Sequence, residues 1–422
     1  METKETKLEE TTGAEKKFFT TPLIIIFVTV FIDLIGFGMV IPLLPYYANT
    51  APFNATPRDI GFLVAAYSVM QFIFSPILGK LSDKYGRRPI LFISLLGSAL
   101  GYFVIGWAST IVLVFVGRII GGVTGGNIST AQAYIADVTS KEDRAKGMGL
   151  FGAAFGLGFI FGPAIAGILS KYGVHVPFYF AAGLSFINAI ALFFILPESL
   201  RPEMRANVAK RKNRFVEMFD SFGNREFREV NIIYFLLVTS FSIMTYAFVL
   251  YTAYRFGYTA EQNGYLFAFV GVIAIIVQGG LIGRLVKKFG EAKLVIVGCL
   301  MMMASFVAVP IVGPSAGGFA MLIAVTALMA VGNSVASPGL TSLASKTADE
   351  RDQGRSLGIL QSGASLARAV GPILGGFLLN NAINAIDDAS LYRTFWTAAA
   401  IMFVAFGVAL YFERTVRDRS LA

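Results

Sequence analysis

Histidine and cysteine are almost absent from this chain of 422 residues, which has one of each, His175 and Cys299. The single cysteine excludes an internal disulfide framework, and the single histidine argues against a histidine-based metal site. Charged residues are also scarce, at 14% of the chain against 55% hydrophobic residues and a mean hydropathy of +0.68. Soluble domains carry about 25% charged residues, so the composition excludes an ordinary soluble protein.

The hydrophobic residues form long continuous runs rather than the short alternating segments of an outer-membrane β-barrel. About 20 apolar residues cross a bilayer as a helix, and this pattern predicts an all-α membrane protein with twelve transmembrane helices. We expect these helices at residues 20–47, 58–81, 89–107, 110–137, 142–171, 176–196, 229–256, 261–287, 292–312, 315–345, 350–379 and 390–413.

The polar segments predict the orientation of the chain. Residues 1–19 mix Lys and Glu without an apolar stretch and are typical of a cytosolic tail, not of a signal peptide. Residues 197–228 form the only long polar loop. Most of the 35 Lys and Arg residues fall in this loop, in the tails and in the other loops that follow every second helix. The positive-inside rule therefore predicts a multi-pass inner-membrane protein with both termini in the cytoplasm.

The net charge of +9 would suggest a nucleic-acid or lipid partner in a soluble protein. Here the basic residues lie beside the membrane, so we expect contact with membrane lipid and no nucleic acid. The basic run Lys210–Lys212 in the middle loop is interpreted as a topology signal next to anionic lipid, with a regulatory or lipid-sensing site as the alternative.

Short motifs recur in the two halves of the chain. Segment 79–81 (GKL) recurs as 283–285 (GRL), Gly126–Asn127 recurs as Gly332–Asn333, and Gly162–Pro163 recurs as Gly371–Pro372. Duplicated six-helix units are typical of transporters that move one bundle against the other around a site at the midplane. We therefore predict two pseudo-symmetric bundles, at 20–196 and 229–413, followed by a cytoplasmic tail at 414–422.

Segment 79–91, with the sequence GKLSDKYGRRPIL, is the most specific motif in the chain. Gly79 permits close contact between neighbouring helices, and Gly86 can adopt the positive φ of a tight turn. Asp83 lies at a helix end, where a neighbouring helix N-terminus would stabilise its charge. A plain basic loop that sets topology is the alternative interpretation.

This motif resembles the GxLaDrxGrkxxl signature of the major facilitator superfamily position for position, and the helix count, the middle loop and the repeat agree with it. The resemblance implies the major facilitator fold. It also implies that Asp83 meets the start of the eleventh helix, near 349–354, and latches the outward-facing state. Asp137, at the end of the fourth helix, is a candidate partner for Arg87 or Arg88.

Asp33 is the only acid well inside a predicted helix, and the other mid-membrane charges are Arg118 and Arg368. A charge at the bilayer centre costs about 3 kcal/mol or more and marks a functional site by default. The segment that opens at Asp33 is similar to the first-helix motif of twelve-span drug:proton antiporters, which include tetracycline and multidrug exporters. The segment that opens at Arg118 resembles the RxxqG motif of the superfamily, with Gly121 in place of Gln. We expect Asp33 and Arg118 to couple transport to protons, with a structural ion pair as the alternative.

The fifth predicted helix carries regularly spaced glycines. They form the series Gly149, Gly158, Gly162–Pro163 and Gly167. The series resembles the antiporter motif G(X)8G(X)3GPxxGG, with Ala166 in place of one glycine, and this resemblance implies export rather than symport. Physically, the glycines provide a groove in which a neighbouring helix packs closely.

Candidate substrate contacts are polar and aromatic side chains inside the predicted helices. Helical phase places Gln132 on the face of Arg118 and Asn127 on the opposite face. The remaining candidates are Tyr67, Gln71, Tyr234, Phe241, Thr245, Phe248, Gln278, Asn333, Ser337, Gln361 and Arg368. Arg368 is expected either to bind an anionic group of a substrate or to hold the eleventh helix to the other bundle. Such a pocket suits amphipathic small molecules.

No phosphate-binding loop of the G-x-x-x-x-G-K-[ST] type is present, so the energy source must be a gradient. The sequence thus predicts a secondary transporter, not an enzyme, without a cofactor or metal and monomeric, that exports a small hydrophobic or amphipathic compound in exchange for protons. Sugar or metabolite efflux or proton symport within the same superfamily is one alternative. A transporter-like receptor or scaffold is the other.

Overall fold

The computed structural model describes residues 19–50, 52–139, 144–200, 225–347 and 353–421, and every regular element in these ranges is helical. The helices of the first half are α1 (Thr21–Asn49), α2 (Pro57–Tyr85), α3 (Arg87–Trp107), α4 (Ile111–Thr124), η1 (Gly125–Asn127), α5 (Ile128–Val138), α6 (Arg144–Ser170) and α7 (Val176–Ile195). Those of the second half are α10 (Arg225–Phe256), α11 (Ala260–Ala274), η2 (Ile275–Leu281), α12 (Ile282–Phe289), α13 (Glu291–Ala308), η3 (Val309–Ile311), α14 (Gly318–Lys346), α15 (Gln353–Leu379) and α16 (Asp388–Leu421).

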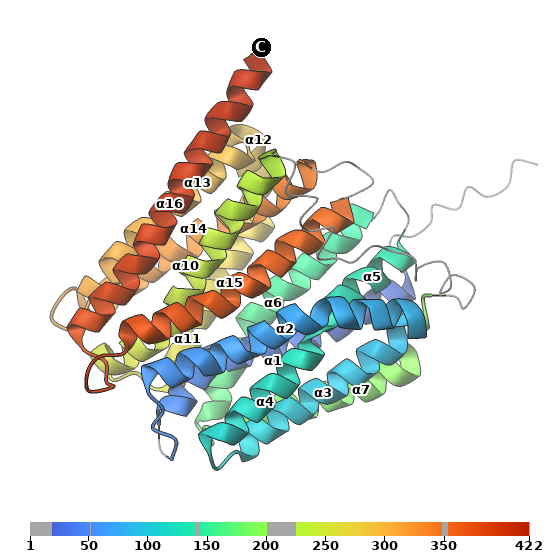
Figure 1. Cartoon of the computed structure of the whole chain (residues 1–422), viewed down its shortest axis with the longest axis horizontal. Coiled ribbons are helices and arrows are strands. Elements are labelled where there is room, and N and C mark those ends of the chain that lie inside the picture. The colour runs from blue at the N-terminus through green and yellow to red at the C-terminus, as the bar shows by residue number, and fades with distance from the viewer. Residues whose placement is uncertain (1–18, 51, 140–143, 201–224, 348–352, 422) are drawn as a thin grey trace, which may run out of the picture.

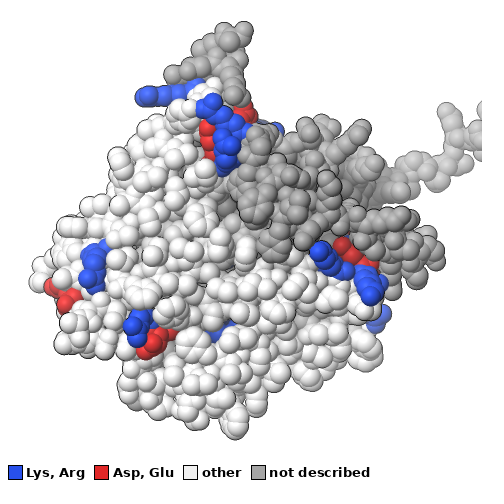
Figure 2. Space-filling view, viewed as in Figure 1, with Lys and Arg blue, Asp and Glu red and all other residues white. Residues whose placement is uncertain are grey.

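These helices confirm the expected membrane architecture. Eleven of the helical stretches are long and apolar enough to cross a bilayer, and α6 adds a shorter apolar stretch at Gly156–Ser170. Large hydrophobic side chains such as Trp107, Ile187 and Phe194 are exposed on the outside of the bundle. Figure 2 shows the same property, because charged side chains form small groups near the helix ends and leave a broad uncharged surface between them. Such a surface is that of a protein embedded in lipid.

Each half forms a group of mutually packed helices. In the first half, α1 packs on α6 and α7, and α3 packs on α4 and α7. In the second half, α10 packs on α15 and α16, and α13 packs on α14 and α16. The halves meet where α2 packs against α15 and α6 against α11, and Figure 1 shows α2 and α15 lying side by side along this junction.

The two halves are closed against each other at one end, which carries the N-terminus of α2 and the C-terminus of α15. There the Tyr246 hydroxyl donates to the carbonyl of Pro57. A Cβ built on Gly61 would lie 2.4 Å from the carbonyl oxygen of Pro372, and one built on Gly264 would lie 2.6 Å from the Cα of Gly167. An ion pair between Lys171 and Glu261, at 2.9 Å, also joins the halves at this end.

At the opposite end the corresponding helices are loosely packed. A Cβ built on Gly358 or Gly363 of α15 would meet no atom within 4 Å, and the same holds for Gly279 and Gly280 of η2 and for Gly156 of α6. Among the described residues, the two halves are thus packed more tightly around Gly61 and Gly264 than around Gly358 and Gly363.

The predicted ends of the chain and of two loops differ from the structure or lie outside the described residues. α16 continues to Leu421, so the predicted tail at 414–422 is largely a helical extension rather than a separate segment. Charged residues such as Arg414 and Arg417 are good helix formers, so the helix does not end where the apolar stretch ends. The basic run Lys210–Lys212 and most of the first tail lie outside the described residues. The predicted contact of Asp83 near 349–354 also falls largely outside them, since only 353–354 of that range are described.

Candidate functional site

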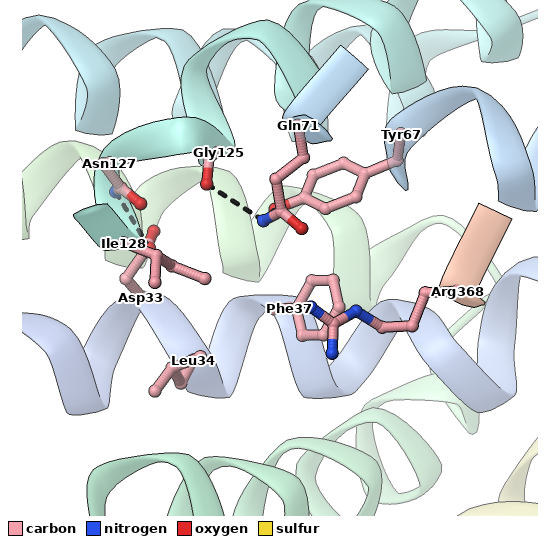
Figure 3. A pocket seen from close by; sticks show the side chains of 9 residues that line it. All are labelled: Asp33, Leu34, Phe37, Tyr67, Gln71, Gly125, Asn127, Ile128 and Arg368. Carbon is pink, nitrogen blue, oxygen red and sulfur yellow. Dashed lines mark hydrogen bonds between the residues drawn. The ribbon is translucent and has the colours of Figure 1, made fainter. Parts of the chain in front are cut away.

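Asp33 lies in a pocket between the two halves at mid-height of α1. The pocket is narrow in this structure, with a cavity of ≈ 10 Å³, which is about the space of one water molecule. It is lined by Asp33, Leu34 and Phe37 of α1, Tyr67 and Gln71 of α2, Gly125, Asn127 and Ile128 of the fourth span, and Arg368 of α15, as Figure 3 shows. Four residues selected in the sequence analysis, Asp33, Tyr67, Gln71 and Arg368, thus line one pocket, and their roles stay predictions.

Asn127 is the hydrogen-bond partner of Asp33, with its Nδ2 donating to Oδ2 at 3.1 Å (Figure 3). The prediction that Asn127 faces away from the site is therefore wrong. The reason is the 3₁₀ segment η1, which interrupts the fourth span at Gly125–Asn127. A 3₁₀ helix has 3.0 residues per turn instead of 3.6, so three such residues turn the following helix by roughly 60° relative to a continuous α-helix.

Arg118 does not pair with Asp33, which corrects the expected ion pair. Its Nε donates to the carbonyl of Leu63 at 3.3 Å and its Nη2 to that of Val64 at 3.2 Å. The guanidinium also lies over the ring of Tyr67, 4.6 Å from the centroid. The carbonyls of α2 thus solvate the buried cation. Arg118 reaches the pocket only through Tyr67.

The two halves of the fourth span have different neighbours, which explains why one residue meets Asp33 and the other does not. α4, which carries Arg118, packs on α2 and α3, whereas α5 also contacts α1. α4 lies close to α2 because it carries Gly122, where a Cβ would lie 2.5 Å from the carbonyl oxygen of Tyr67. Gly122 therefore allows α4 and α2 to pack closely.

A polar chain crosses the pocket from one half to the other. Gln71 donates through Nε2 to the carbonyl of Gly125 at 3.0 Å, and its Oε1 lies 3.4 Å from the hydroxyl of Ser365 on α15. That hydroxyl also lies 3.1 Å from the carbonyl of Gln361 and accepts a hydrogen bond from Nη2 of Arg368 at 3.1 Å. Ser365 is thus the side chain through which α15 contacts Gln71 of the first half at this pocket.

Aromatic rings form the apolar part of the pocket wall. The Phe37 ring lies 5.3 Å from that of Tyr67 and 5.9 Å from that of Phe159, in geometries favourable for ring packing. Phe37 was not among the predicted site residues. Its position four residues after Asp33 places it on the same helix face, so the sequence did carry a signal for it.

Most predicted substrate contacts of the second half lie outside this pocket. Thr245 donates to the carbonyl of Phe241 within α10, and Phe248 is buried against Phe267. Gln278 is exposed on the π-helical segment η2. The other predicted contacts that do not line the pocket are Gln132, Tyr234, Phe241, Asn333, Ser337 and Gln361. The pocket lies closer to the first half because α10 and α14 provide no lining residue in this state.

The glycines of α6 pack against the helix that carries Asp33. A Cβ on Gly158 would lie 2.6 Å from Cβ of Leu34, and one on Gly162 would lie 2.7 Å from the carbonyl carbon of Gly38. This contact confirms the predicted groove. Gly167 instead faces α11 of the other half, and Gly149 and Pro163 belong to the same helix. The glycine series therefore joins the pocket to the closed junction.

Segment 79–91 forms a charged network at the open end. Gly86, with φ +109°, makes the one-residue turn between α2 and α3. Arg87 pairs with Asp83 and donates through Nε to Asp137 at 3.1 Å. The expected pairing of Asp137 with Arg87 is confirmed. Arg88 instead donates to the carbonyl of Phe193, and Gly79 is buried in α2.

Glu198 belongs to the same network and was missed by the sequence analysis. Its carboxylate accepts hydrogen bonds from the backbone N–H groups of Arg87 at 2.9 Å and Arg88 at 3.2 Å. These are the first N–H groups of α3, where the helix dipole favours an acid. Glu198 is far from segment 79–91 in the sequence, so no local motif predicted that it would join this network.

No group of three or more His, Cys, Asp or Glu side chains suited to a metal ion occurs among the described residues. The charged and polar groups of the pocket come from four different helical spans. Gln71 belongs to the first half, and Ser365, which contacts it, belongs to the second. A change in the packing of the halves must therefore alter the surroundings of Asp33 and Arg368.

Comparisons with known proteins agree with this architecture. The family model described as Major Facilitator Superfamily matches residues 26–318 and 280–421. The chain is 32% identical over 394 residues to the class H tetracycline resistance protein of Pasteurella multocida, covering 93% of this chain and 96% of the relative. It is 29% identical to multidrug resistance protein 2 of Bacillus subtilis, covering 94% and 96% of the two chains.

Solved structures show the same fold. A human organic anion transporter superposes with a TM-score of 0.68 at 24% identity, covering 92% of this chain and 99% of that one. A bacterial homologue of the human lysosomal transporter Spinster, described in an inward-facing and unoccupied conformation, superposes with a TM-score of 0.75 at 13% identity, covering 95% and 98%.

Proposed function

Because this chain belongs to the major facilitator superfamily, we propose that it exports a small hydrophobic or amphipathic compound from the cytoplasm in exchange for protons. The chain is a multi-pass membrane transporter of twelve helical spans. Asp33 is the proton carrier in this proposal. The bilayer in question is the inner membrane, with both termini in the cytoplasm.

The observation that carries the proposal is the position of Asp33. It is an acid in the middle of a transmembrane helix, it lines the pocket between the halves, and its one hydrogen-bond partner in the described part of the chain is the neutral Asn127. Among the described residues, no cationic side chain forms an ion pair with it within 4 Å. A carboxyl group in this place can therefore bind and release a proton as the pocket changes its access.

The direction of access follows from the closed junction. With cytoplasmic termini, the closed end of α2 and α15 faces outward, and the loosely packed end with segment 79–91 faces the cytoplasm. The structure then corresponds to an inward-open state, in which a compound reaches the pocket from the cytoplasm. The proton would leave Asp33 on this side and be replaced by one from outside when the junction opens.

The substrate class is supported by the pocket and by the relatives. Phe37 and Tyr67 offer ring faces, while Gln71 and Asn127 offer amide groups. Such a mixture suits compounds with an apolar body and a few polar groups. The relatives at about 30% identity are named as tetracycline and multidrug resistance proteins. These names support a drug-like compound rather than a sugar.

A transport assay in proteoliposomes tests the proposal. Tetracycline and ethidium, both labelled, are followed across a membrane that carries a pH gradient of one unit, with proton movement recorded by a pH-sensitive dye. One proton per substrate across one pH unit supplies about 1.4 kcal/mol, so we expect up to about tenfold accumulation on the acidic side. Glu413→Gln, which removes an acid of α16 that does not line the pocket, serves as control.

The rival functions give different results in this assay. Accumulation of compound on the alkaline side, in the direction of proton flow, would identify a symporter. Flux that ignores the pH gradient would identify a facilitator. No flux of any compound, together with intact binding, would favour a receptor or scaffold.

A further inference from the structure

Arg368 is a cation in the pocket whose hydrogen-bonding capacity is mostly unused. A guanidinium has five N–H donors and no acceptor. In the part of the chain that the structure describes, Arg368 makes one hydrogen bond, from Nη2 to the hydroxyl of Ser365 three residues earlier on the same helix. No carboxylate of the described residues forms an ion pair with it within 4 Å. Its side chain lines the pocket and points into it, as Figure 3 shows.

Three other arginines of the spans have carboxylate or carbonyl partners that Arg368 lacks. Arg87 pairs with Asp83 and Asp137, and Arg255 pairs with Asp388 at 3.1 Å. Arg118 has no carboxylate partner, but two of its nitrogens donate to backbone carbonyls and its face is covered by a tyrosine ring. A buried cation normally finds such compensation. Among the described residues, Arg368 has only the Ser365 hydroxyl as a hydrogen-bond partner.

The position of Arg368 also excludes the simpler structural role. A residue that ties α15 to the first half would bond to that half, but Arg368 bonds within its own helix and leaves the tie to Ser365 and Gln71. Its surroundings instead resemble one end of a ligand site. Tyr234 and Tyr67 lie near enough to interact with it electrostatically, and the ring of Phe37 lines the same pocket.

We propose that Arg368 binds an anionic group of the transported compound, so that the substrate is an organic anion or zwitterion with an aromatic body. This inference rests on the proposed function and specifies its substrate class. The carboxylate, sulfonate or phenolate of the compound would take the free N–H groups of the fork, which match two anionic oxygens. The aromatic body would lie against Tyr67 and Phe37, on the side of Asp33.

Binding of two matched dyes tests the inference. Fluorescein is an anion and rhodamine 6G is a cation, and both carry the same xanthene ring system. Their binding to the purified full-length protein in detergent is measured by fluorescence anisotropy at one neutral pH without a gradient. A charge-assisted hydrogen-bond pair is strong enough that we expect fluorescein to bind at least about tenfold more tightly. The variants are Arg368→Gln and Arg368→Lys, and Lys288→Gln removes one exposed positive charge as control.

Arg368→Gln should abolish the preference for fluorescein. Arg368→Lys should retain part of this preference, because the positive charge remains while the planar guanidinium is lost. Lys288→Gln should leave the preference unchanged. Thermal unfolding of each variant shows whether it is folded, and Arg368→Lys gives a second result if Arg368→Gln is not. Equal binding of both dyes, tighter binding of rhodamine, absence of fluorescein binding, or a preference that survives Arg368→Gln would overturn the inference. Proton-driven export of tetracycline or ethidium would still stand in those cases, because it is measured separately across a pH gradient.

Discussion

Gly61→Ala should open the junction between α2 and α15, which the proposed orientation places on the outer side. A Cβ at residue 61 would lie 2.4 Å from the carbonyl oxygen of Pro372 and 3.0 Å from the Cα of Gly376. Both neighbours are backbone atoms of α15, so neither can move away by a change of rotamer. The contact joins the two halves and exists only while they are closed at this end. The substitution therefore acts on the equilibrium between states rather than on the fold of either half.

The size of the effect follows from the cost of overpacking. Inserting one methyl group into a tightly packed contact costs about 1–3 kcal/mol. If this cost falls on the closed state alone, the ratio of outward-open to inward-open molecules rises by about 5- to 150-fold. A molecule that is almost wholly inward-open would become a measurable mixture of both states.

Distances between spin labels on Asn54 and Asn384, at the outer ends of the two halves, report this equilibrium. We expect a second, longer distance to gain population in Gly61→Ala. Gly183→Ala is the matched control, because a Cβ at that glycine would meet no atom within 4 Å. An unchanged distance distribution in Gly61→Ala, in protein that is folded, would refute the assignment of this junction as the closed gate.

Three further predictions concern other contacts. Gly38→Ala should lower the thermal unfolding temperature, because its Cβ would lie 2.5 Å from the carbonyl oxygen of Gly158 inside one half. The expected loss of folding free energy is about 1–3 kcal/mol. An unchanged unfolding temperature would contradict the tight packing of α1 on α6. Arg118→Lys should impair transport although it keeps the charge, since an ammonium group cannot donate to the carbonyls of α2 with the same fixed geometry; wild-type transport would mean that charge alone matters. Hydrogen bonds that the Lys171 ammonium makes with Glu261 and Tyr265 raise the pKa of Lys171 above its usual 10.5. The pair therefore contributes fully at neutral pH and is lost as the pH rises through that raised pKa. The difference in outer distance between wild type and Lys171→Gln should therefore be constant across neutral pH, and a difference that varies with pH in this range would contradict the assignment.

The sequence predicted the helices and the charged inner loop well, because their signals are local. A run of about 20 apolar residues has one stable arrangement in a bilayer, and each expected range contains a helix. The turn at Gly86 and the pairing of Arg87 with Asp137 also followed, since segment 79–91 specifies a short turn between two helix ends.

The pocket was predicted less completely, because its geometry depends on packing between distant segments. Helical phase assumed a regular fourth span, whereas η1 turns Asn127 toward Asp33. The partners of Arg118 are backbone carbonyls of α2, and a carbonyl leaves no residue-specific signal in the sequence. Which side chains of the second half reach the pocket depends on the state of the junction, and neither composition nor spacing encodes that state.

Paired flux measurements on Asp33→Asn test the central claim, that this carboxyl carries the proton exchanged for substrate. Uphill export driven by a pH gradient and substrate-for-substrate exchange without a gradient are measured in the same vesicles, with Glu413→Gln as the control. The account predicts that Asp33→Asn loses uphill export and proton movement but retains exchange, because an amide cannot release a proton while the pocket stays intact. Uphill export at the wild-type rate in Asp33→Asn would contradict it.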